Sequence, residues 1–238
     1  MKAVEVRELV KDYGSFRAIN GISFEVNEGE IFGLIGPNGA GKTTALRVVA
    51  TLLQITSGSI TVFGYELPKE AGEVRKIISY LPEEAGAYKN LTGEQYLNFI
   101  AKFFGDGEKS QDMVQRGLEI ANLGERINDK VDTYSKGMTR RLLVGRALMV
   151  NPRLAILDEP TSGLDVVNAQ EVRRIINSSV EAGVAVLLSS HNMLEVELLC
   201  HRIALINDGK IVASGTATEL KKEYDARNIE EAFVKAIK

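Results

Sequence analysis

Alternating apolar and polar residues mark the first part of the chain, and this pattern predicts half-exposed antiparallel strands. The alternation is clearest over residues 4–10 and 22–26. Short apolar runs follow further along, and such runs are typical of strands, above all of strands buried in a parallel sheet. They occupy residues 30–35, 59–63, 77–81, 153–157 and 184–189.

After residue 83 the sequence pattern becomes typical of helices. Thr92 and Gln95 form a capping box, and apolar residues then recur at helical spacing. These apolar residues are Leu97, Ile100, Ala101 and Phe104. Two more helices are predicted over 110–123, with Gly124 just past its end, and over 135–150. The pattern therefore predicts an all-helical insertion in a chain that otherwise alternates strands and helices.

The last third of the chain returns to strands. A helix over 166–181 separates two apolar strands, which predicts a right-handed parallel unit. Asn207-Asp208-Gly209 indicates a hairpin, and the charged tail from Thr218 is predicted to be helical. The fold class is α/β, with a parallel-sheet core, an N-terminal antiparallel β part and an inserted helical part. The expected divisions of one 238-residue domain are 1–82 and 152–215 for the core with its antiparallel part, 83–151 for the helices and 216–238 for the tail.

Composition narrows the function classes. The chain carries 29 Lys and Arg against 32 Asp and Glu, a net charge of −3, so the broad basic field of a nucleic-acid-binding protein is missing. Cys200 is the single cysteine and cannot form an internal disulfide. The N-terminus lacks the apolar region of a signal peptide, and no run approaches the roughly 18 apolar residues of a membrane helix. We therefore expect a cytoplasmic protein that works with membranes only through other chains.

A nucleotide-binding motif stands directly after the apolar run at 30–35. The sequence fits G-x-x-x-x-G-K-[ST], with a second threonine behind it, and reads Gly36, Pro37, Asn38, Gly39, Ala40, Gly41, Lys42, Thr43 and Thr44. Backbone N–H groups of such a loop cradle phosphates, Lys42 reaches the β- and γ-phosphate oxygens, and Thr43 offers a hydroxyl to Mg²⁺. A helix over 42–53 would point its positive end at the same phosphates. A chance glycine-rich turn is the alternative, but the strand before it and the helix after it favour nucleotide binding.

Two further strand ends carry chemistry. Asp158 and Glu159 follow four apolar residues; Asp158 can hold Mg²⁺ through water, and Glu159 can orient or deprotonate a water molecule at the γ-phosphate. A solvated acidic turn is the alternative. His191 follows the neighbouring strand and can contact the terminal phosphate, because ligands of open parallel sheets bind beyond the carboxyl ends of strands. His201 has no such placement and is predicted to be structural.

A second anion site is predicted at the helix that begins near residue 135. Ser135 is an N-cap candidate, and Gly137 leaves the first turn bare. Lys136, Arg140 and Arg141 add positive charge nearby or are simply solvated helix residues. At the other end of the chain, Tyr13 sits at a turn, where its ring either caps the edge of the core or stacks on a base.

Together these residues resemble the ATP-hydrolysing subunit of ATP-binding-cassette (ABC) transporters, a family of P-loop NTPases with a RecA-like core. The resemblance covers essentially the whole chain in the family's order. It assigns Tyr13 as the adenine-stacking aromatic, Gly36–Thr43 as Walker A, Leu154–Asp158 as Walker B, Glu159 as the catalytic glutamate, Ser162–Asp165 as the D-loop, His191 as the switch histidine and Tyr134–Met138 as the signature segment.

The resemblance implies ATP and Mg²⁺ as cofactors and a head-to-tail pair of subunits, identical or closely related. In that pair Ser135 and Gly137 of one subunit contact the γ-phosphate held by Lys42 of the other, and Asp165 belongs to the same nucleotide site. Membrane-spanning permease subunits would be the partners, with the chain peripheral on the inner face of the cell membrane. The tail at Ile229–Phe233 resembles the drug- and sodium-efflux branch, which favours export.

The chain departs from the family at two places. Lys136 and Met138 replace the usual Gly and Gln of the signature, and Glu83 stands where the family has a metal-contacting Gln. Two alternative functions stay open at this point. One is a cassette without a transporter, acting in cluster assembly, translation or DNA repair; translation types usually carry two cassettes and repair types long coiled coils, and neither is present. The other is a P-loop kinase, which would need an acceptor site and a lid and would not need a signature at Ser135.

Overall fold

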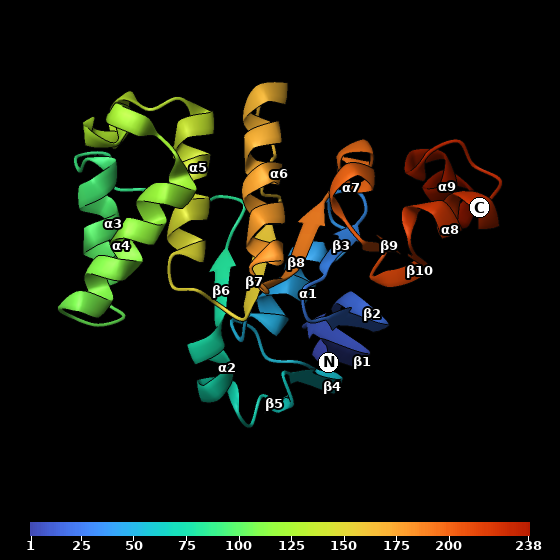
Figure 1. Cartoon of the computed structure of the whole chain (residues 1–238). Helices are drawn as coiled ribbons and strands as arrows, with labels where there is room; N and C mark the ends of the chain where they lie inside the picture. The colour runs from blue at the N-terminus through green and yellow to red at the C-terminus, as the bar shows by residue number, and fades with distance from the viewer.

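Two sheets and a set of helices make up the computed structural model, which describes residues 1–238 (Figure 1). The smaller sheet is antiparallel, with strand order β2-β1-β4-β5. Its strands are β1 (Lys2–Tyr13), β2 (Phe16–Asn27), β4 (Ser57–Val62) and β5 (Tyr65–Leu67). β1 and β2 extend beyond the alternating segments because their backbone pairing continues from Lys2↔Asn27 to Tyr13↔Phe16.

The larger sheet has the order β10-β9-β3-β8-β7-β6, and it is parallel except for the hairpin of β9 and β10. Its strands are β3 (Ile31–Ile35), β6 (Ile78–Leu81), β7 (Leu154–Asp158), β8 (Ala185–Ser190), β9 (Arg202–Asn207) and β10 (Lys210–Gly215). Every residue of β3, β7 and β8 is buried, as their continuous apolar sequence predicts. The predicted α/β class with an antiparallel β part and an inserted helical part is confirmed.

The helices fall into distinct groups around the sheets. They are α1 (Lys42–Val49), α2 (Ala71–Ile77), α3 (Gly93–Ala101), α4 (Glu108–Ala121), α5 (Lys136–Leu148), α6 (Val166–Glu181), α7 (Met193–Leu199), α8 (Ala217–Glu223) and α9 (Ile229–Ala236), with short 3₁₀ turns at Gly124–Asn128 and Val131–Thr133. Figure 1 shows α3, α4 and α5 together on one side of the parallel sheet and α8 and α9 at the opposite end. No helix is long and apolar enough to cross a membrane.

The predicted helix ends need three corrections. α1 stops at Val49 rather than at residue 53. α4 ends before Asn122, whose left-handed backbone (φ 46°) closes the helix in place of the predicted Gly124. α3 ends at Ala101, so Phe104 lies beyond it and is half exposed instead of continuing its buried face.

Apolar contacts connect the inserted helices to the sheet. Leu97 of α3 and Leu157 of β7 belong to one apolar cluster, which fills the space between the helices and one face of the larger sheet. A second cluster joins the other face of that sheet to α1 and the antiparallel sheet, for example through Leu46 and Val4. The parallel sheet is thereby covered on both faces and presents its strand ends as the accessible edge.

Candidate functional site

The carboxyl ends of β3, β8 and β7 meet at one edge of the larger sheet. Ile35 pairs with Ser190, and Ser189 pairs with Asp158. Each strand is followed at once by one of the predicted motifs: the glycine-rich loop, His191 and Glu159. The register therefore brings the three motifs together, at the position where open parallel sheets bind ligands.

The loop after β3 is shaped by glycines that no larger residue could replace. A Cβ on Gly36 would lie 2.0 Å from the carbonyl oxygen of Ile206. Gly41 has φ 103°, and a Cβ there would lie 2.7 Å from the carbonyl oxygen of Ala18. Gly39 also has positive φ, at 82°. The backbone can thus curl close to its neighbours and leave its N–H groups for a phosphate, which is the fit that a P-loop requires.

Lys42 is folded back over this loop. Its Nζ donates to the carbonyls of Gly36 (2.7 Å) and Pro37 (3.1 Å), and lies 3.5 Å from Oε1 of Glu159. Both side chains are almost fully buried. The buried ammonium is therefore surrounded by carbonyl and carboxylate oxygens. Phosphate oxygens of a nucleotide would take the place of these partners.

Glu159 combines backbone strain with an unpaired buried oxygen. It has φ 49°, in the left-handed region, and its N–H donates to Oγ of Ser189 (3.0 Å). Oε2 lies 2.9 Å from Nδ1 of His191, while Oε1 has no hydrogen-bond partner. A strained residue with an unsatisfied carboxylate oxygen is unusual in a folded protein, and such residues cluster at functional sites. His191 itself is exposed beside it.

The side chain of Asp158 contacts a different set of groups from that of Glu159. Its Oδ1 accepts from the hydroxyls of Thr43 (3.1 Å) and Ser189 (2.5 Å), and its Oδ2 lies 3.4 Å from the Tyr80 hydroxyl. Burial raises the pKa of Tyr80, and the carboxylate of Asp158 adds to the rise. A carboxylate beside a threonine hydroxyl is a hard-oxygen donor pair, so these residues fit Mg²⁺. The structure contains no group of three or more His, Cys, Asp or Glu residues that could hold a metal ion.

A cavity of about 380 Å³ opens over the loop. It is lined by Tyr13, Phe16, Ala18, Asn38, Gly39, Gly41, Lys42, Thr43, Thr44, Glu83 and Glu159. Tyr13 and Phe16 are both exposed, at the ends of β1 and β2, so two aromatic rings are available to a base where the sequence pointed to one. Glu83 shares this cavity with Lys42, and its role as a metal ligand stays a prediction. Gly36, Pro37 and Ala40 belong to the loop but not to the cavity wall.

Ser135, Gly137 and Asp165 lie outside this cavity. Ser135 caps α5 by accepting from the N–H of Met138 (3.2 Å), as predicted. The turn at Gly137 is not bare, however: a Cβ there would lie 2.1 Å from Cγ of Asn168.

Asp165 caps α6 and is held by the same asparagine. It accepts from the backbone N–H (2.9 Å) and the side-chain amide (2.6 Å) of Asn168, and these bonds hold the pKa of Asp165 below its usual range. The side chain of Lys136 lies against Gly163. The signature segment is therefore packed on the D-loop of its own chain, through contacts of Asn168 that local sequence does not reveal.

One of the two roles predicted for Arg140, that of a solvated charge on the helix surface, is wrong. The structure buries it, with 7% of the residue exposed, and its Nη2 donates to the carbonyl of Glu83 (2.9 Å). Burial lowers the pKa of its guanidinium, opposed by the carboxylates of Glu83, Asp158 and Glu159. Arg141, one residue on, donates instead to the carbonyl of Asn122 (3.0 Å).

His201 is structural, as predicted. Its Nδ1 accepts from the N–H of Ile31 (2.9 Å), and its own backbone N–H donates to the Ile31 carbonyl. The ring thus fixes the start of β3 at the end remote from the loop.

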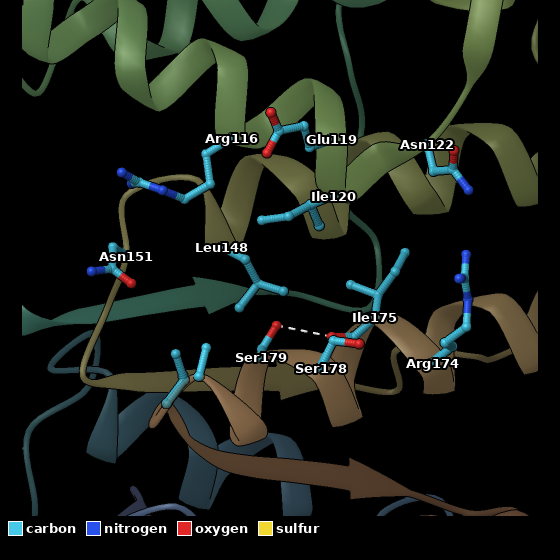
Figure 2. Close-up of a pocket in the computed structure, with 12 residues that line it drawn as sticks. Arg116, Glu119, Ile120, Asn122, Leu148, Asn151, Arg174, Ile175, Ser178 and Ser179 are labelled. Atoms are coloured by element: carbon cyan, nitrogen blue, oxygen red, sulfur yellow. Dashed lines mark hydrogen bonds between the residues drawn. The ribbon is translucent and has the colours of Figure 1, made fainter.

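A larger cavity, of about 540 Å³, lies elsewhere (Figure 2). Figure 2 shows Arg116 and Glu119 of α4 on one wall, facing Ser178 and Arg174 of α6 on the other. None of the motif residues lines it. Size alone would therefore have pointed to the cleft between α4 and α6 and away from the strand ends.

Comparisons with known proteins agree with this geometry. The family model described as ABC transporter matches residues 19–162. The linearmycin resistance ATP-binding protein LnrL of Bacillus subtilis is 38% identical, over 99% of this chain and 78% of that protein. The daunorubicin/doxorubicin resistance ATP-binding protein DrrA of Streptomyces peucetius is 37% identical, over 92% of this chain and 67% of that protein. A solved structure described as the ATP binding subunit of an ABC transporter matches with a TM-score of 0.86 and 29% identity, over 99% of this chain and all of that one.

The chain belongs to the ABC transporter family, as an ATP-binding subunit. It is an ATPase that couples ATP hydrolysis to transport. This membership excludes the two alternative functions, a cassette without a transporter and a P-loop kinase. A dimeric structure of the cassette MJ0796 bound to ADP and Pi shares the fold, with a TM-score of 0.78 at 23% identity.

Proposed function

We propose that two copies of this subunit, or this subunit and a close relative, bind two Mg-ATP molecules head to tail between them. The observation that carries this proposal is the separation of the predicted signature segment from the nucleotide cavity: Ser135 and Gly137 do not line the cavity that holds Lys42. A nucleotide in that cavity would leave the signature segment without a ligand unless a second subunit supplied one. The dimeric arrangement described for MJ0796 offers a precedent.

Within the cavity, the residues take distinct roles. The loop from Gly36 to Thr44 would hold the phosphates, with Lys42 exchanging Glu159 for the γ-phosphate, and Tyr13 would stack on the base. Thr43 and Asp158, joined by Glu83, would hold Mg²⁺, which neutralises phosphate charge when bound. Asp165 would contribute from the D-loop.

Glu159 is proposed as the residue that orients the attacking water. Its Oε1 makes no hydrogen bond and has only the Lys42 ammonium beside it at 3.5 Å, which a γ-phosphate would draw away, and its Oε2 lies 2.9 Å from Nδ1 of His191. One oxygen is thus available to a water molecule while the histidine holds the carboxylate in place. His191 lies at the edge of the same site, where it can also contact the terminal phosphate.

The direction of transport is proposed to be export. The relatives named above are resistance proteins against linearmycin and daunorubicin or doxorubicin, and an amphipathic α9 bears the efflux-like segment Ile229–Phe233. We propose drug-like amphiphiles as the substrates and separate permease subunits as the path across the membrane. The subunit would then be peripheral on the inner face of the cell membrane, with no nucleic acid among its partners.

An exposed aromatic surface around α3 is suited to the permease. Tyr88, Phe99 and Phe103 stack edge to face at 5.4 and 5.3 Å between ring centroids, although each is exposed. Phe104 adds a fourth exposed ring. Exposed aromatic clusters of this kind mark protein interfaces, and this one follows the segment that carries Glu83.

Affinity capture from detergent-solubilised membranes tests the transport proposal. A tagged Glu159→Gln subunit, held in its ATP-bound form, should recover a polytopic membrane protein together with a second ATPase subunit. The same capture with Lys42→Ala should recover the membrane protein but less of the ATP-dependent pair. Recovery of cytoplasmic proteins alone would contradict the proposal.

A further inference from the structure

Arg140 connects the signature helix to the nucleotide cavity of its own chain. It lies in α5, the helix that Ser135 caps, and its Nη2 donates to the carbonyl of Glu83 across 57 positions of sequence. Arg146, two turns further along the same helix, lies 3.4 Å from the carbonyl of Tyr80. Two guanidinium groups of α5 therefore hold the segment that ends β6 and carries Glu83 into the cavity.

Two polar groups at this connection, the carboxylate of Glu83 and Nη1 of Arg140, have no partner in the chain. Glu83 is exposed and makes no ion pair, although it lines the same cavity as the carboxylate of Glu159. Nη1 of Arg140 is buried and has no acceptor. A buried guanidinium N–H without a partner is costly, and so is an unpaired carboxylate next to bound phosphates.

We propose that Arg140 is a positioning residue that places Glu83 in the nucleotide cavity and offsets the charge that Glu83 adds there. The proposal rests on the proposed binding of Mg-ATP in that cavity. Because the guanidinium holds the Glu83 carbonyl, Glu83 moves with α5. Contact of Ser135 with the partner's nucleotide is thereby transmitted to the metal-facing carboxylate at the subunit's own nucleotide.

The positive charge of Arg140 matters most before a metal is present. ATP then brings four negative charges toward Glu83, Asp158 and Glu159, and the buried guanidinium of Arg140, bonded to the Glu83 carbonyl, is a cation that interacts with all three carboxylates. Coulomb interactions in a partly buried site are several-fold stronger than in water. If Arg140 acts by compensating Glu83, its removal should matter only while Glu83 carries its charge.

A double-mutant cycle of ATP binding in EDTA tests this compensation. The four proteins are the parent, Arg140→Gln, Glu83→Gln and the double variant, titrated with a fluorescent ATP analogue. We expect Arg140→Gln to weaken binding about five-fold in the parent and less than two-fold in the Glu83→Gln background. An equal factor in both backgrounds, or no effect in either, would overturn the proposal.

Controls separate this role from simple support of the fold. Arg141→Gln removes the same charge one residue along α5 and should leave binding unchanged. Each variant is checked by thermal unfolding, and Arg140→Met replaces Arg140→Gln in the cycle if the glutamine variant unfolds early. A parent protein that fails to bind ATP would overturn the proposed function as well, whereas a parent that binds without coupling in the cycle overturns the Arg140 proposal alone.

Discussion

Oε1 of Glu159 lies 3.5 Å from Nζ of Lys42, and the two side chains are only 5% and 6% exposed. The two residues are far apart in sequence, and they meet because β3 and β7 both lie against β8. The pair neutralises two buried charges in the absence of nucleotide. In the proposed site, the γ-phosphate would replace Glu159 as the partner of Lys42, which would leave the carboxylate free to receive a water molecule.

Replacing Glu159 by Gln should uncouple binding from turnover. The amide no longer competes as an anion for Lys42, so ATP affinity should be unchanged or higher, while hydrolysis should slow by about 10² or more, as for a lost general base. ATP-bound dimer should accumulate and be visible by gel filtration with ATP. Unchanged hydrolysis, with only monomer on the column, would contradict the assignment.

Lys42→Ala should show the opposite pattern. It removes the cation that the loop directs at the phosphates and leaves Glu159 as a buried, unpaired carboxylate. We expect nucleotide binding itself to weaken by at least ten-fold, measured by equilibrium titration. Affinity within a factor of two of the parent would contradict a phosphate-binding role for Lys42.

Mixed subunits test the composite site. In a heterodimer of Ser135→Arg and Lys42→Ala chains, both lesions fall in one of the two nucleotide sites, and the other site is intact. Each variant alone should be inactive, whereas the mixture should recover partial ATPase activity. Complete inactivity, with heterodimer formation verified by differential tags, would count against action of Ser135 on the partner's nucleotide.

The sequence predicted those parts of the site that are contiguous and lie at strand ends. The loop at Gly36–Thr44, the Asp158–Glu159 pair and His191 each follow a recognisable apolar strand, so the rule for ligands of parallel sheets was enough to bring them together. The contact between Glu159 and Lys42 is a consequence of strand order, which no local pattern contains.

Burial of Arg140 could not be predicted for the same reason. Arg140 and Arg141 are adjacent cations on one helix, and only the packing of α5 against the segment at Glu83 decides that the first is buried. The side chain of Asn168 against Gly137 likewise depends on how α6 meets α5. Short elements were also missed: β5, α2 and α7 are three to seven residues long, too short for a periodic pattern to be distinct.

Gly36 offers a prediction about stability. A Cβ at this position would lie 2.0 Å from the backbone oxygen of Ile206, which no side-chain rotation can relieve. Gly36→Ala should therefore lower the free energy of unfolding by roughly 1–3 kcal/mol, the range for an overpacked core. Gly72 of α2 is the matched control because a Cβ there meets no atom within 4 Å, so Gly72→Ala should be neutral or slightly stabilising. Equal melting temperatures for both variants would contradict the close approach at Gly36.

The exposed rings near α3 offer a prediction about assembly. Phe103 is 72% exposed, so Phe103→Ser should leave the melting temperature and the ATPase activity of the isolated subunit unchanged. If the aromatic surface contacts the permease, the same variant should lower the amount of subunit recovered with membranes about ten-fold. Leu52→Ser, an exposed apolar residue on the segment after α1, serves as the control and should be recovered like the parent.

Replacing Glu83 should change the dependence of ATPase activity on the Mg²⁺ concentration. Its carboxylate shares the cavity with Thr43 and Glu159, and each like charge at about 4 Å costs on the order of 4 kcal/mol at an effective dielectric near 20. Mg²⁺ can offset such a charge, and a carboxylate is a stronger ligand for it than the amide of the usual glutamine. Glu83→Gln should therefore raise the Mg²⁺ concentration for half-maximal ATPase activity several-fold, while ATP binding in EDTA is unchanged or slightly tighter.

A Glu83 that instead takes up a proton would alter the pH profile of activity and leave the Mg²⁺ curve in place. If both curves overlay those of the parent, Glu83 lies outside the electrostatic reach of the nucleotide, and contact with the permease becomes the better account of its place in this loop.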